Sequence, residues 1–210
     1  MIRLIIFDFL GTLGYYDPAE YHEVFTKLRE FNLPVNEGKP AKVLAEILPD
    51  FFSDADSWKD LTNKIIQKLG IVLEQDRRES LEAFLERKLT CKLYDDVEDI
   101  LSLPQDKAIL TLSGKFVIDS ISQLSHFEVF SPKIAGAKKP DEKAFLAVLE
   151  KMQADPEEAM MVGDSLENDI LPALALGMKA ILIDRGGIHP KIDDPSIIKI
   201  SSLGELKRYL

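Results

Sequence analysis

Residues 5–18 read IIFDFLGTLGYYDP, an apolar run that ends on Asp8 and then breaks into a Gly-Thr turn. Short continuous apolar runs are typical of strands that are covered on both faces of a parallel sheet. A carboxylate at the end of an otherwise apolar strand indicates a role beyond packing. The stretch therefore predicts a buried strand that presents a functional acid at its carboxyl end.

Further short apolar runs recur along the chain and predict strands of the same kind. They lie at residues 3–7, 107–111, 159–162 and 180–183, with shorter candidates at 128–130 and 197–200. Helical patterns at residues 141–153 and 165–177 lie between them, the second starting on Ser165 as a helix cap and ending at Gly177. Strands alternating with helices predict an α/β fold with a doubly wound, mostly parallel, Rossmann-like sheet.

Residues 15–92 interrupt this alternation, because they show helical patterns alone. The predicted helices are at 19–31, 41–52, 58–69 and 77–90. We therefore expect an α/β core made of residues 1–14 and 93–210, with residues 15–92 inserted as an α-helical cap domain. Ligands bind at the carboxyl ends of the strands in such sheets, so we expect the insertion to lie over the site.

Composition narrows the class of protein. Apolar residues make up 46% of the 210 residues, which is enough for a substantial core, and the formal net charge is −10. This charge argues against nucleic-acid or membrane-surface partners. A single cysteine, Cys91, excludes an internal disulfide and a cysteine-rich metal site. We expect a cytoplasmic protein, either a monomer or a homodimer, without a membrane span.

Polar side chains gather where the predicted strands end. Because the carboxyl ends of parallel strands share one edge of the sheet, three carboxylates, hydroxyl groups and an ammonium are expected to converge there. Such a set can bind a hard cation together with a phosphate, and Mg²⁺ is the cation that prefers oxygen ligands beside phosphates. The residues are Asp8, Thr111, Ser113, Asp164, Asp169 and the pair Lys138 and Lys139.

Four motifs in order resemble those of the haloacid dehalogenase superfamily, over nearly the whole chain. They read DFLGTL at residues 8–13, AILTLSG at 108–114, KKPDEKAF at 138–145 and VGDSLENDI at 162–170. The insertion after the first motif resembles the family's version with a helical, C1-type cap. The resemblance implies a hydrolase, most simply a phosphatase acting on a small phosphorylated metabolite.

The resemblance also implies a catalytic role for three side chains. Asp8 is the expected nucleophile, which forms a covalent aspartyl intermediate. Thr111 is expected to hydrogen-bond the transferred phosphoryl group, and Lys139, with Lys138 as the other candidate, to neutralise the charge on nucleophile and substrate.

Metal and substrate residues follow from the same resemblance. Asp8, Asp164 and the main-chain carbonyl of Leu10 are expected to hold Mg²⁺, with Asp169 supporting the metal or the lysine. The expected substrate-binding residues are Gly11 and Thr12 in the turn after the nucleophile, Ser113, and Tyr15 at the mouth of the pocket.

Leu10 departs from the family pattern. The family's phosphatases carry a second Asp at this position, which protonates the leaving oxygen and then activates the water. General acid–base help of this kind is typically worth about 10²–10⁴-fold. Leu10 leaves the expected metal site in place and removes the proton shuttle, which favours substrates with good leaving groups.

Two alternatives stay open. In a 2-haloacid dehalogenase the halide leaves unprotonated, and that branch of the family has a tyrosine where this chain has Leu10. Those enzymes, however, carry an asparagine where this chain has Leu112, work without metal, and use an arginine soon after the first motif, whereas the first here is Arg29. The other alternative is a binding or regulatory protein that keeps the fold but turns over weakly or not at all.

One further motif is accidental. GDSL at residues 163–166 matches the signature of an esterase family, but in that family the serine follows an early strand and a histidine lies far downstream. Here Ser165 lies late in the chain and His189 only 24 residues after it. We expect His189 to be a loop residue without a ligand role.

Overall fold

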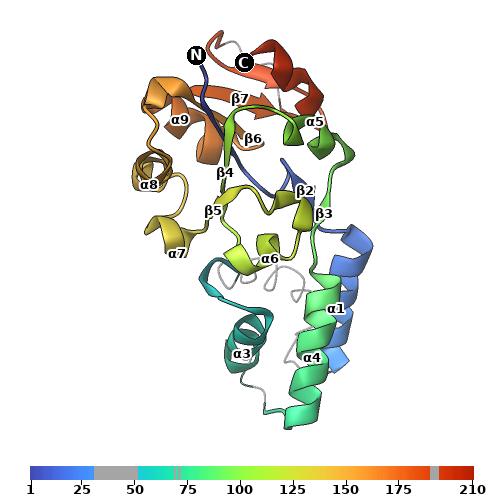
Figure 1. The fold of residues 1–210 in the computed structure, drawn as a ribbon. Helices are drawn as coiled ribbons and strands as arrows, with labels where there is room; N and C mark the ends of the chain where they lie inside the picture. Colours follow the sequence, from blue (N-terminus) through green and yellow to red (C-terminus); the bar gives the residue numbers. More distant parts are fainter. Residues whose placement is uncertain (31–51, 69, 71, 190–193) are drawn as a thin grey trace.

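A computed structural model describes residues 1–30, 52–68, 70, 72–189 and 194–210 of the chain. Six parallel strands form one sheet, which confirms the predicted α/β architecture (Figure 1). Each predicted strand is present, with its ends shifted by no more than one residue. In spatial order the strands are β5 (Glu128–Phe130), β4 (Asp106–Leu110), β1 (Leu4–Phe7), β6 (Ala159–Gly163), β7 (Lys179–Ile183) and β8 (Ile198–Ile200).

Strand β1 lies near the middle of the sheet and is buried on both faces. Its four residues are at most 1% exposed. Ile5 and Phe7 point into one apolar cluster, whereas Leu4 and Ile6 point into a second cluster on the other face. Helices cover both faces, as a continuous apolar strand requires. The core helices are α5 (Glu98–Leu101), α6 (Lys115–Asp119), α7 (Pro132–Ala135), α8 (Glu142–Met152) and α9 (Leu171–Ala175).

The predicted helix at residues 165–177 has a more complex form than its pattern indicated. Ser165 is its N-cap, since its hydroxyl accepts a hydrogen bond of 3.1 Å from the Asn168 N–H. A π-helical turn, Leu166–Ile170, comes first, followed by α9. Gly177 ends the segment with a φ of +83°. The wider first turn directs Asp169 back toward the sheet edge.

Among the described residues of the inserted segment, three long helices lie apart from the sheet, at the lower end of Figure 1. They are α1 (Pro18–Glu30), α3 (Trp58–Lys68) and α4 (Gln75–Lys88), and α4 packs against the other two. Buried side chains of this segment, such as Leu61 and Leu81, belong to the same apolar cluster as Phe7. The helix predicted at residues 41–52 falls, except for Phe52, outside the described residues.

A two-stranded ribbon joins the inserted segment to the sheet. Strand β2 (Gly14–Tyr15) pairs antiparallel with β3 (Lys92–Leu93), so the outgoing and returning chains run side by side. The sequence did not predict this ribbon, because two-residue strands are too short to show periodicity. No helix in the described part of the chain is long and apolar enough to cross a membrane.

Candidate active site

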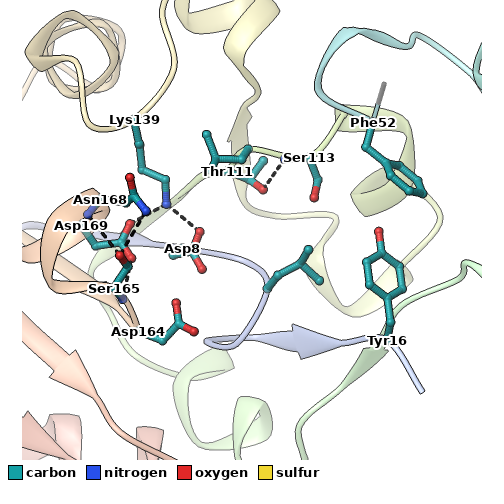
Figure 2. Close-up of a pocket in the computed structure, with 12 residues that line it drawn as sticks. Asp8, Tyr16, Phe52, Thr111, Ser113, Lys139, Asp164, Ser165, Asn168 and Asp169 are labelled. Atoms are coloured by element: carbon teal, nitrogen blue, oxygen red, sulfur yellow. Dashed lines mark hydrogen bonds and ion pairs between the residues drawn. The ribbon is translucent and has the colours of Figure 1, made fainter. Parts of the chain in front are cut away.

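The carboxyl ends of β1, β4 and β6 meet at one cavity of about 220 Å³. Asp8, Thr111 and Asp164 each follow one of these three neighbouring strands directly. Figure 2 shows the side chains that surround the cavity. The lining residues are Asp8, Leu10, Tyr16, Phe52, Thr111, Leu112, Ser113, Lys139, Asp164, Ser165, Asn168 and Asp169.

A buried ammonium joins two of the carboxylates. Nζ of Lys139 donates to Oδ1 of Asp8 at 2.6 Å and to Oδ1 of Asp169 at 2.5 Å. All three side chains are at most 10% exposed. Burial alone would lower the pKa of Lys139, but the two adjacent carboxylates outweigh it and raise the pKa, so the lysine is charged. Lys139 therefore enters the site, whereas Lys138 is exposed.

The chain after β6 is shaped to bring Asp169 to this lysine. The Ser165 N–H donates to Oδ2 of Asp169 at 3.1 Å, which orients the carboxylate. Gly163 leaves the space that Asp169 fills, because a Cβ at Gly163 would lie 2.4 Å from the Asp169 carboxyl. Gly163 and the Ser165 N–H are therefore both needed for the contact between Asp169 and Lys139.

Among the described residues that line the cavity, acidic side chains outnumber cationic ones. Carboxylate oxygens of Asp8, Asp164 and Asp169 all lie within 4.8 Å of one another. Burial, with a further contribution from the Asp8 charge, raises the pKa of Asp164 to about 6. An all-oxygen set with excess negative charge matches the preferences of a hard divalent cation such as Mg²⁺.

Gly11, in the turn after β1 and Asp8, leaves space for the Asp164 side chain and does not itself line the cavity. Gly11 has a φ of +85°, and a Cβ there would lie 2.0 Å from Oδ2 of Asp164. The Phe9 carbonyl closes the turn by accepting from the N–H groups of Leu13 at 2.8 Å and Gly14 at 2.9 Å. Only glycine tolerates both this backbone angle and this approach.

The other expected substrate residues divide into two groups. Oγ1 of Thr111 accepts from the Ser113 N–H at 2.9 Å, and both residues line the cavity. Gly11, Thr12 and Tyr15 do not line it. Thr12 is fully buried, and the Tyr15 ring packs on Tyr94 with 4.9 Å between centroids. Tyr16 lines the cavity in place of its neighbour.

The loop after β7 supports the site in a way that the sequence did not reveal. His189 lies in a loop as expected, but its Nε2 donates to the main-chain carbonyl of Asp164 at 2.9 Å. Arg185 of the same loop donates to the Thr12 carbonyl at 2.7 Å and pairs with Asp96 at 2.8 and 2.9 Å. These contacts require β7 to lie beside β6, which no local motif indicates.

Comparison with known proteins places this arrangement among hydrolases. Residues 2–177 match the family model described as haloacid dehalogenase-like hydrolase. A phosphoserine phosphatase from Thermus thermophilus is 30% identical over 139 residues, which cover 62% of this chain and 55% of that enzyme. This chain matches several of its curated relatives, including this phosphoserine phosphatase, over less than two thirds of the relative's own length.

Two longer matches agree with this result. A glyceraldehyde 3-phosphate phosphatase from Methanocaldococcus jannaschii is 24% identical over 228 aligned positions, covering 98% of this chain and 96% of that enzyme. Among solved structures, a haloacid dehalogenase-type phosphatase from Thermococcus onnurineus is 26% identical with a TM-score of 0.72, covering 99% of this chain and 97% of that one.

The close approach of Gly11 to Asp164 can be tested with two alanine variants. Gly177 has nearly the same φ as Gly11, but no atom lies within 4 Å of where its Cβ would be, so it is the matched control. We expect Gly11→Ala to lose at least about 1 kcal/mol more unfolding free energy than Gly177→Ala, because it adds steric overlap to the shared backbone strain. Urea unfolding measures both. Equal losses would contradict the packing of Asp164 on this turn.

Proposed function

The chain belongs to the haloacid dehalogenase-like hydrolase family, and on this premise we propose that it is a Mg²⁺-dependent phosphatase with Asp8 as its nucleophile. The observation that carries the proposal is the position of the Asp8 carboxylate. It lies at a cavity, 2.6 Å from the Lys139 ammonium and within 4.8 Å of two further carboxylates. A cation and a phosphoryl group together would balance this charge.

Each side chain then has one part in the reaction. Asp8 attacks the phosphorus, and Lys139 holds the Asp8 carboxylate in place and neutralises part of the charge. Thr111 and Ser113 offer hydroxyls to the phosphoryl oxygens from the end of β4. Asp8, Asp164 and the Leu10 main-chain carbonyl, with Asp169 in support, would hold Mg²⁺, which would neutralise charge and orient the phosphate.

Leu10 limits which substrates can react. Its side chain lines the cavity, and it carries no proton to give to a leaving oxygen. The substrates that suit this site are small activated phosphates, whose leaving group departs as an anion. Residues 15–92, as a cap over the cavity, would exclude water while the phosphoryl group is transferred.

The dehalogenase alternative fits the site less well. Leu10 is non-acidic, as that reaction allows, but the complete carboxylate cluster of Asp8, Asp164 and Asp169 has no use in a metal-free displacement. Leu112, in place of the halide-binding asparagine, also lines the cavity. The alternative of a non-catalytic binding protein predicts no turnover with any phosphate, and the activity test below separates it from the phosphatase.

Magnesium binding should appear first as a gain in stability. At about 100 times its dissociation constant a ligand adds about 2.7 kcal/mol to folding, and such a gain shifts the Tm of a chain of this size by about 5–10 °C. We expect Mg²⁺ at constant ionic strength to raise the Tm of the wild type by this amount. Thermal denaturation followed by circular dichroism measures the shift.

Two asparagine variants show where the ion binds. Asp164→Asn should abolish most of the Mg²⁺-dependent shift. Asp106→Asn should keep it, because Asp106 is exposed at the amino end of β4, on the opposite edge of the sheet from Asp8. An equal response of both variants to Mg²⁺ would show that the ion binds elsewhere.

We expect activity to require Asp8, and we expect an acid at position 10 to extend it to alkyl phosphates. We expect Mg²⁺-dependent phosphate release from p-nitrophenyl phosphate, lost in Asp8→Asn. Leu10→Asp should increase hydrolysis of an alkyl phosphate such as ethyl phosphate by about 10²–10⁴-fold over Leu10→Asn, because only the carboxyl can protonate an alkoxide. Release of inorganic phosphate measures both. Turnover that survives in Asp8→Asn would overturn the assignment of the nucleophile.

A further inference from the structure

The cavity has two chemically different ends. Figure 2 shows Lys139 and the acids at one side of Asp8, with Tyr16 and Phe52 at the other. The second end, which we name the apolar end, is formed by Tyr16 and Phe52, and Leu10 and Leu112 add two further apolar side chains to the lining of the cavity. A phosphoryl group on Asp8 would thus have its leaving group directed toward carbon-rich side chains.

Further aromatic rings pack against Phe52 and hold it in place at the apolar end. The Phe52 side chain is only 4% exposed, and its ring lies 5.9 Å from that of Tyr16. The Phe116 ring stacks on Phe52 at 6.4 Å with an interplanar angle of 11°, and Trp58 meets Phe52 edge-on at 6.2 Å. Rings packed at these distances form a preformed apolar surface rather than a loose one.

The described lining offers no second cation to an anionic leaving group. Lys139 is the one cationic side chain among the described lining residues, and it already contacts Asp8 and Asp169. A carboxylate on the leaving group would find no second cation among the described lining residues, and burying a charge without a counter-charge is costly. The leaving group is therefore expected to be uncharged.

Cavity size sets a further limit. At about 220 Å³ the space is smaller than the roughly 300–1,000 Å³ typical of sites for drug-sized ligands. A phosphoryl group and one ring are compact enough to fit such a space. Tyr16 and Phe52 offer that ring the offset or edge-to-face contacts that aromatic groups prefer.

We propose that the substrate is a monoester of phosphate with a single uncharged aromatic ring, an aryl phosphate, whose ring lies against Tyr16 and Phe52. This inference rests on the proposed function and adds the class of substrate. An aryl phosphate suits two features of the cavity at once. Its ring matches the aromatic surface, and its phenol ionises near a pKa of about 10, far below the pKa of aliphatic alcohols, so it can leave as an anion although Leu10 offers no proton.

The reaction balances without a protein acid. The Asp8 oxygen forms a bond to phosphorus while the bond between phosphorus and the aryl oxygen breaks, and the electron pair leaves on the phenolate. Water then forms a bond to phosphorus and the bond to Asp8 breaks, which restores the carboxylate. One proton of the water passes to an oxygen of the phosphate itself, so the second step is slow but complete.

The substrate class can be tested with two esters of closely similar leaving-group acidity. Phenyl phosphate and 4-carboxyphenyl phosphate differ mainly in the charge on the ring, and acetyl phosphate has a good leaving group without a ring. We expect kcat/KM for phenyl phosphate to exceed that for 4-carboxyphenyl phosphate at least about tenfold, because the added carboxylate finds no cation. Equal values for the two esters would overturn the inference.

Variants test the ring contact itself. Phe52→Ala should lower the ratio of kcat/KM for phenyl phosphate to that for acetyl phosphate about tenfold, and Phe52→Leu should lower it less. Phe84→Ala is the matched control, because Phe84 is a partly buried aromatic residue of α4 that does not line the cavity. Its ratio should equal that of the wild type.

The outcomes separate this inference from the proposed function. If acetyl phosphate is hydrolysed in an Asp8-dependent way while the ratio is unchanged in both Phe52 variants, the phosphatase stands and the aryl substrate is wrong. If no Asp8-dependent hydrolysis of acetyl phosphate occurs, the proposed function fails and the inference fails with it. The comparison of esters in the wild type remains decisive if Phe52→Ala does not fold.

Discussion

The rest of the site depends on the ammonium of Lys139, buried between the carboxylates of Asp8 and Asp169. Charges are stable in a protein interior only when they are paired and hydrogen-bonded, so the two acids and the lysine can be buried only in contact with one another. Their meeting requires β1 beside β6, and it requires Gly163 to leave room for Asp169. The ends of β1 and β6, Gly163 and the π-helical turn that carries Asp169 thus all contribute to meeting one electrostatic requirement.

Much of this was predictable because the strands are short, apolar and end on polar residues. Asp8, Thr111 and Asp164 follow buried runs, and parallel strands align such ends at one edge. Contacts between residues that the fold brings together from distant parts of the sequence could not be predicted, because no sequence motif marks them. His189 reaches the Asp164 carbonyl only because β7 lies beside β6, and the two-residue ribbon at Gly14–Tyr15 is too short to show a period.

The ribbon also explains why Tyr16 lines the cavity and the adjacent Tyr15 does not. Tyr15 belongs to β2 and packs on Tyr94, whereas Tyr16 follows the strand and reaches the cavity. Adjacent residues in an extended chain point to opposite sides, so the sequence alone could not distinguish them without the register. Among the described lining residues, Tyr16 gives the cavity an aromatic surface and position 10 carries Leu10 instead of an acid, and these two properties favour the same kind of substrate, the aryl phosphate proposed above.

The central claim is that Asp8 receives the phosphoryl group, and trapping the intermediate tests it most directly. Since Leu10 supplies no base for the second step, the aspartyl phosphate should accumulate when the protein is mixed with acetyl phosphate and Mg²⁺. Acid quenching, borohydride reduction and peptide mass spectrometry should then find homoserine at position 8 and unmodified aspartate at positions 164 and 169. Reduction at another carboxylate, or a phosphoryl group on Thr111 or Ser113 with Asp8 unmodified, would contradict the account.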